Sequence, residues 1–63
     1  MIITRNLVTA DGDPILDLIS ETGSTIRIIE HAGERHAWLR RLGGPAVEIP
    51  ADPISIRNHT TGL

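Results

Sequence analysis

The sequence predicts an all-β fold, a small antiparallel barrel or sandwich of five to six short strands that we expect dimerisation to complete. Five or six short apolar segments follow one another closely, and clusters of Gly, Pro, Asp and Ser separate them. The chain has only 63 residues, no Cys and a single aromatic residue, Trp38. A domain of this size buries about 60% of its unfolded surface, so without disulfides it needs another source of stability.

The same features limit what the chain can be, from its number of domains to its expected compartment. We expect a single β domain over residues 1–57 and a flexible tail over residues 58–63. The lack of Cys excludes disulfides and thiolate metal sites, which leaves oligomerisation as the expected source of stability. No apolar run reaches the roughly 18 residues of a membrane span. Residues 1–8 are too short and too polar for a signal peptide, so we expect a cytoplasmic protein.

The first two strands are expected at Met1–Val8 and Ile15–Ser20. Thr9–Pro14, between them, contains the turn formers Asp-Gly and Asp-Pro. Ile15–Ser20 could form a short helical turn, but it is too short for a free-standing helix, which favours a strand. Glu21–Ser24 predicts the next turn.

Thr25–Leu42 predicts a β-hairpin, because β-branched and apolar residues flank the turn signal Ala32-Gly33-Glu34. With Gly33 and Glu34 at the tip, the numbers of paired residues sum to 67, so that Arg27 faces Arg40 and His31 faces His36. The largely apolar face then carries Ile26, Ile28, Glu30, Ala37, Leu39 and Arg41. The mixed face carries Arg27, Ile29, His31, His36, Trp38 and Arg40. A register slip of one residue would move Trp38 to the opposite face.

Beyond the hairpin, Gly43-Gly44-Pro45 breaks regular structure, and Ala46–Ile49 predicts a short strand that ends at Pro50. Asp52-Pro53 can open a helical turn or a loop. Ile54–Arg57 alternate as in a strand, so the sequence leaves both strand and helix open in this segment.

Positive charge is concentrated in the hairpin, although the net charge of the chain is −2. Residues 26–42 carry four Arg and two Glu, whereas residues 1–25 carry one Arg and four acidic residues. Arg binds phosphate or carboxylate bidentately, and a Trp flanked by Arg is typical of a platform that stacks unpaired bases. Trp38 can instead fill a core or a dimer interface, and Arg27 opposite Arg40 can simply be solvated.

No other chemistry is indicated. The acidic residues and His form no nucleophile–base–orienter set, so we expect no catalytic residues, no cofactor and no enzymatic activity. His31 and His36 with Glu34 between them could hold a transition metal, but this spacing is not a known signature and we expect no metal.

The chain resembles the carbon storage regulator family (CsrA/RsmA), small bacterial dimers with interlocking strands that bind GGA motifs in messenger RNA leaders. The segments that carry the resemblance are Met1-Ile2-Ile3-Thr4-Arg5, the hairpin Ile26–Leu39, Gly43-Gly44-Pro45, Val47-Glu48-Ile49, and Asp52 with Ile54. The spacing from Arg35 to Ile54 agrees without a gap. The resemblance implies RNA binding through Arg5.

This sequence also departs from the family pattern. Asn6 stands at the position of the family's second N-terminal Arg, and Val8–Pro14 replaces a tighter turn. Ala51 corresponds to an Arg that contacts RNA in the family, and Pro53 is expected to shorten or remove the C-terminal helix. If the fold is shared, RNA binding is lost or moves to Arg27, Arg40 and Arg41.

Two functions therefore remain open. The first is a homodimeric RNA-binding regulator of translation, in which Arg5, Arg27, Arg40 and Arg41 bind RNA and Trp38 stacks on a base or packs the dimer. The second is a protein-interaction module, a small phage or bacterial inhibitor, adaptor or assembly protein that acts through a sheet edge or the Arg/Trp face.

Overall fold

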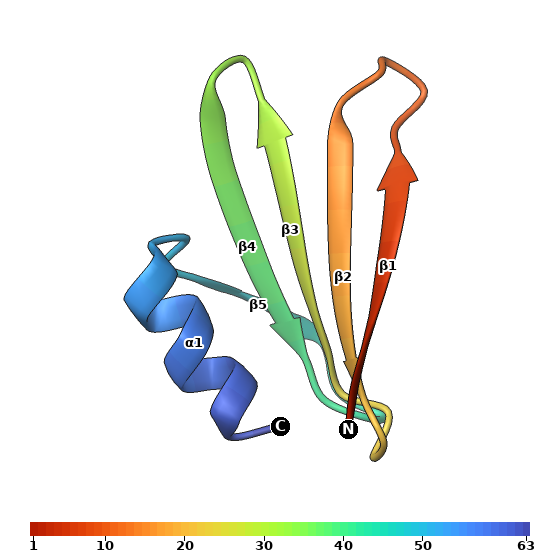
Figure 1. Cartoon of the computed structure of the whole chain (residues 1–63), viewed down its shortest axis with the longest axis vertical. Coiled ribbons are helices and arrows are strands. Elements are labelled where there is room, and N and C mark those ends of the chain that lie inside the picture. The colour runs from red at the N-terminus through yellow and green to blue at the C-terminus, as the bar shows by residue number, and fades with distance from the viewer.

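The structure is a computed structural model that describes all residues 1–63, and it contains one five-stranded antiparallel sheet and one helix (Figure 1). The strands lie in the order β1-β2-β3-β4-β5, so each strand pairs with the next one in the sequence. The elements are β1 (Ile2–Val8), β2 (Pro14–Ser20), β3 (Thr25–His31), β4 (Glu34–Arg40), β5 (Ala46–Ile49) and α1 (Pro53–Thr61). The predicted antiparallel, β-rich fold is confirmed. The segment Ile54–Arg57, where strand and helix were both open, is helical, so the strands number five.

The tip of the β3–β4 hairpin is Ala32-Gly33, and the predicted tip Gly33-Glu34 is wrong. The paired residue numbers sum to 65, which places Arg27 opposite Trp38. Ala32 has φ 52° and Gly33 has φ 78°, the two positive values of a type I′ turn. The second position of this turn favours glycine most strongly, and a Gly33-Glu34 tip would have placed Glu34 there.

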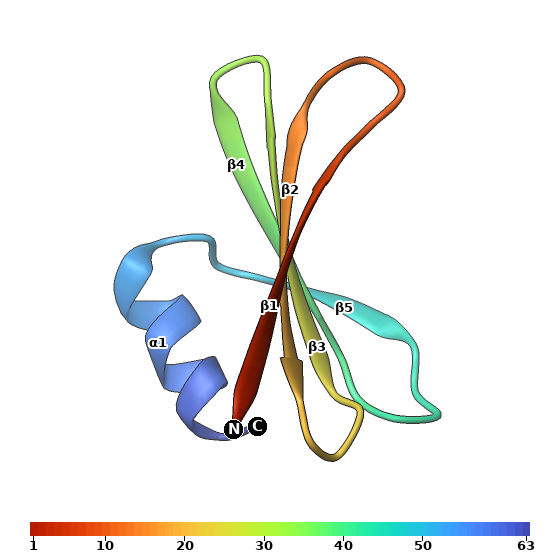
Figure 2. The ribbon, with the colours of Figure 1, turned by 45° about the vertical axis from the view of Figure 1, so that its right-hand side comes forward.

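The two-residue difference in register leaves both faces of the hairpin as predicted. Side chains alternate along a strand with a period of two, so a shift of two residues returns each one to the same side. Ile26 and Ala37 are buried together with Ile49, and partly buried apolar residues pack against them: Leu18, Ile28, Leu39, Ala51 and Leu63. The helix α1 lies on this side of the sheet (Figure 2). We call the opposite side, which carries Arg27 and Trp38, the open face.

The helix α1 has clear signals at both ends. Asp52 is its N-cap and accepts a hydrogen bond from the backbone N–H of Ser55 at 2.9 Å. Pro53 occupies the start of the helix, where its missing N–H removes no hydrogen bond, so the expectation that Pro53 could remove the helix is wrong. The helix continues through Thr61, into the segment that we expected to be a flexible tail. Gly62 caps it, and Leu63 packs against the core cluster.

The hydrophobic core of the chain is small. Six residues are buried and only three of them are hydrophobic. The sheet does not close on itself, because β1 and β5 are edge strands. These edge strands expose large apolar side chains, namely Ile3, Leu7, Val8 and Val47. The single chain therefore leaves both strand edges and apolar surface free for further contacts.

The helix α1 is nine residues long, and no helix of the structure is long and apolar enough to cross a membrane.

Candidate binding site on the open face of the sheet

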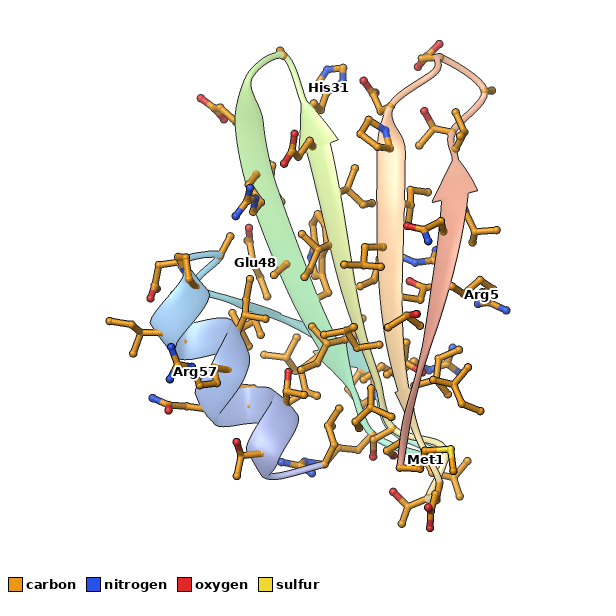
Figure 3. The ribbon with its side chains drawn as sticks, in the orientation of Figure 1. Met1, Arg5, His31, Glu48 and Arg57 are labelled. Atoms are coloured by element: carbon orange, nitrogen blue, oxygen red, sulfur yellow. The ribbon has the colours of Figure 1, made fainter.

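One row of side chains crosses the open face through all five strands. The strand registers place Arg5 beside Asp17, Asp17 beside Arg27, Arg27 beside Trp38 and Trp38 beside Glu48. We call these five residues the central row. Figure 3 shows Arg5 and Glu48 at its two ends. Because every neighbour in the row is a directly paired residue, the sheet itself sets the spacing of these side chains.

Asp17 forms an ion-pair clamp with Arg5 and Arg27. Its side chain is 0% exposed, whereas those of Arg5 and Arg27 are 53% and 44% exposed. Arg27 donates from Nε to Oδ1 at 2.8 Å and from Nη2 to Oδ2 at 3.0 Å. Arg5 donates from Nη2 and Nε to Oδ2, at 2.8 and 3.3 Å. The buried carboxylate is therefore fully paired, as a buried charge requires.

These contacts shift the pKa values of Asp17 and Arg27. Hydrogen bonding with Arg27 lowers the pKa of the Asp17 carboxyl below its ordinary value of 3.8. Burial opposes this change, while the hydrogen bonds and charge of Arg5 add to it. Hydrogen bonding with Asp17 raises the pKa of Arg27 in turn. Asp17 is consequently ionised at neutral pH, and Arg27 keeps its charge.

A hollow of about 460 Å³ lies on the open face over the central row. Its lining consists of Arg5, Thr25, Arg27, Ile29, Trp38, Arg40 and Ala46. Arg40 lies opposite Thr25 and has no carboxylate partner. The lining contains three guanidinium groups and no carboxylate, and two of these groups are paired with Asp17, so the lining is positively charged on a chain whose net charge is −2. The hollow is suited to an anion.

Trp38 lines the hollow and stacks with the ring of His36. The rings of His36 and Trp38 are stacked, with centroids 5.9 Å apart and an angle of 29° between their planes. His36 is not part of the lining, whereas Trp38 is. His36 also contacts Glu48, whose Oε2 lies 3.3 Å from Nδ1, and Glu34, whose Oε2 lies 3.4 Å from Nε2. Glu48, the acidic residue at the end of the central row, therefore contacts His36 beside the hollow.

The structure brings four of the five sequence-predicted binding residues together. Arg5, Arg27, Trp38 and Arg40 all line the hollow. The fifth, Arg41, is exposed just beyond the end of β4 and lies outside it. The predicted opposition of Arg27 and Arg40 is wrong, because Arg27 pairs with Trp38.

Sequence reasoning missed Asp17. Its signal was a charged residue inside the otherwise apolar strand Ile15–Ile19, since a carboxylate within a buried strand requires a cationic partner. His31 and His36 were expected to face each other. Instead His31 pairs with Glu34 and its Nδ1 lies 2.7 Å from Asp13 Oδ2, so this contact ties the tips of the two hairpins together.

Comparison of the chain with protein-family models, with curated proteins and with solved structures found no match.

Proposed function

We propose that this chain is a small, non-enzymatic, homodimeric protein that binds single-stranded RNA on the open face and regulates translation in the manner of the carbon storage regulators. The observation that carries this proposal is the grouping of Arg5, Arg27 and Arg40 with the only Trp of the chain around one hollow.

The chemistry of the hollow suits unpaired RNA better than a duplex. Proteins recognise single strands by stacking bases on aromatic side chains and by holding phosphates with Arg or Lys. Trp38 offers a ring on the hollow, and Arg40 has no internal partner to compete for a phosphate. The net charge of −2 argues against a protein that coats nucleic acid nonspecifically, which points to a short, localised contact.

The proposal also draws on the resemblance to the carbon storage regulators. The hairpin, the Gly-Pro loop and the short strand follow one another in the order on which that resemblance rests, and α1 follows in the segment where the sequence left a helix open. Ala51, which replaces an RNA-contacting Arg of the family, packs against the core cluster. The proposal therefore assigns RNA contact to the hollow and to Arg5.

Dimerisation is supported by what the single chain leaves uncovered. Three buried hydrophobic residues make a small core, and the unpaired edges of β1 and β5 carry exposed apolar side chains. Pairing between edges of two copies would remove these edges and complete a barrel or sandwich. Sedimentation equilibrium at micromolar concentration is expected to give twice the mass of the chain. A stable monomer would contradict this part of the proposal.

The second candidate function is binding of a protein partner by strand addition. The observation that favours it is the free β1 edge, on which Ile3 and Val8 expose apolar side chains to opposite faces. An extended peptide can pair with such an edge and place alternate side chains against them. This binding would depend on β1 and would be insensitive to charge at Arg40.

A titration of RNA separates the two functions. A fluorescent RNA hairpin with GGA in its loop is titrated with the protein at about 50 and 200 mM salt, and three phosphate contacts predict a log–log salt slope of about −2. Arg5→Ala is expected to weaken binding about ten- to hundredfold. The matched control is Arg57→Ala, because Arg57 lies on α1, away from the open face (Figure 3). No binding at about 50 μM protein would overturn the RNA proposal, since weak nonspecific binding already reaches that range.

A further inference from the structure

The Asp17 clamp uses one edge of each guanidinium group. Arg5 and Arg27 both donate to Asp17 through Nε and Nη2. Neither Nη1 atom takes part in a hydrogen bond within the chain. A guanidinium group has five N–H donors in a fixed plane, so two of them on Asp17 leave three on Nη1 and Nη2. One N–H on Nη1 and one on Nη2 form a second fork with the spacing that binds two phosphate oxygens at once.

A Lys could not replace either Arg in this arrangement. An ammonium group is a point charge, and it has no second planar edge to offer once it is paired with Asp17. The clamp therefore does more than neutralise a buried carboxylate. It fixes two guanidinium planes beside a hollow and keeps a free fork on each.

Trp38 limits how many bases can stack. Its ring stacks with that of His36 and lines the hollow. The hollow, at about 460 Å³, falls within the range of about 300 to 1,000 Å³ of pockets that hold small ligands. One planar base with its sugar and phosphate is a ligand of this class.

We infer that the hollow is a subsite for a single unpaired nucleotide, in which Asp17 positions Arg5 and Arg27 so that their free forks hold the phosphate while the base stacks on Trp38. This inference rests on the proposed RNA binding and adds to it a ligand unit and a positioning residue, Asp17. Arg40, which has no carboxylate partner, supplies further positive charge at the same phosphate.

Substitution of Asp17 separates a positioning role from simple electrostatic attraction, because the two predict opposite changes in affinity for an anion. Asp17→Asn removes a negative charge beneath the phosphate, so a purely electrostatic surface would bind an anion more tightly. If Asp17 positions the two guanidinium planes, the same change weakens binding, because the freed side chains lose their fixed geometry. We expect the affinity to fall about fivefold or more.

The direct test uses adenosine 5′-monophosphate as the probe and the fluorescence of Trp38, the only Trp in the chain, as the readout. We expect saturable quenching with a Kd of about 0.1 to 1 mM, which corresponds to a weak single-unit ligand. Adenosine is expected to bind at least about tenfold more weakly, and inorganic phosphate is expected to compete. Equal binding of adenosine and the monophosphate would overturn the role of the forks, and absence of quenching would overturn the stacking.

Substitution of the clamp completes the test. Arg5→Lys and Arg27→Lys keep the charge but lose the second fork, and each is expected to weaken binding of the monophosphate about tenfold. The matched control is Arg57→Lys on α1, which is expected to leave binding unchanged. If Asp17→Asn unfolds the chain, these two variants still decide the question. Unchanged binding in both, or tighter binding in a folded Asp17→Asn variant, overturns the inference.

The inference and the proposed function fail in different ways. RNA binding that the monophosphate does not displace, and that survives Arg5→Lys and Arg27→Lys, would overturn the subsite and leave the RNA proposal standing. Binding of the monophosphate without binding of RNA would support the subsite as a site for free nucleotides and would overturn the RNA proposal.

Discussion

The two faces of the sheet use neighbouring residues of the same strands in opposite ways. On the helix side, Ile26 of β3 is fully buried against Ala37 of β4 and Ile49 of β5. One residue further along β3, Arg27 is on the open face, half-exposed and paired with the buried Asp17. The helix side thus holds the apolar core, and the open face holds a buried charge with exposed cations around it. Because side chains alternate, the two faces can be altered separately along one strand.

The largest contrast is expected between two isoleucines of β3. Ile26→Ala removes a fully buried side chain from a very small core, and is expected to cost about 3 kcal/mol and to lower the Tm by about 15 °C. Ile29→Ala, on the open face and only partly buried, is expected to cost about 1 kcal/mol. Thermal unfolding followed by circular dichroism measures both. Equal losses would show that the open face is covered in solution, by a second copy for instance.

A smaller loss is expected when the clamp is broken. Asp17→Asn leaves two guanidinium groups without their carboxylate, but both are about half-exposed and can be hydrated. We therefore expect a cost of about 2 kcal/mol, below that of a pair buried on both sides. Urea unfolding gives the free energy directly. A neutral or stabilising effect would mean that the clamp serves only the ligand.

The clamp also predicts a dependence of stability on pH. The pKa of Asp17 is lowered in the folded chain below its ordinary value of 3.8, which the unfolded chain keeps. A carboxyl with a depressed folded pKa stabilises the fold above its unfolded pKa, and this contribution is lost as the pH falls through the folded pKa. The wild-type chain is expected to lose stability below about pH 4, and Asp17→Asn to lose less over the same range. Parallel pH profiles would rule out this linkage.

The smallest effect is expected at the hairpin tip, which belongs to neither face. Ala32 has φ 52°, a conformation that costs a residue with a Cβ about 1 kcal/mol and that Asn tolerates better. Ala32→Asn is expected to stabilise the chain by about 0.5 to 1 kcal/mol and to leave binding of the monophosphate unchanged. Ala32→Val is the opposite control. A change in binding would indicate that the tip contributes to the site.

The sequence predicted the faces of the hairpin more reliably than its pairing. Alternation along β3 and β4 assigned Ile26 and Ala37 to the core and grouped Arg27 with Trp38, and both assignments survive a register shift of two residues. The pairing itself depended on which two residues take positive φ at the tip. The position of the tip is set by the backbone conformation at Gly33, and the periodicity of apolar residues carries no information about that conformation.

The sequence did not predict the helix α1 or the Asp17 clamp, and the reasons differ. Ile54–Arg57 alternate in hydropathy, and the capping by Asp52 and the position of Pro53 outweigh that alternation. The clamp depends on Asp17 lying between Arg5 and Arg27, which are 12 and 10 residues away in the sequence. Only the order and register of β1, β2 and β3 bring them together, and neither could be derived from one strand at a time.

The uninterrupted order of the strands also bears on how the chain folds. Each strand pairs with its neighbour in sequence, so every loop that must close is short and its entropic cost is low. Folding speed falls as contacts become more distant in sequence, and we expect this sheet to fold faster than barrels and sandwiches that pair distant strands. The lining of the hollow nevertheless includes residues of both edge strands, Arg5 of β1 and Ala46 of β5. Nucleotide binding by the chain would therefore require the last pair of strands to have formed. During refolding, the rise of the binding signal would show when the sheet is complete.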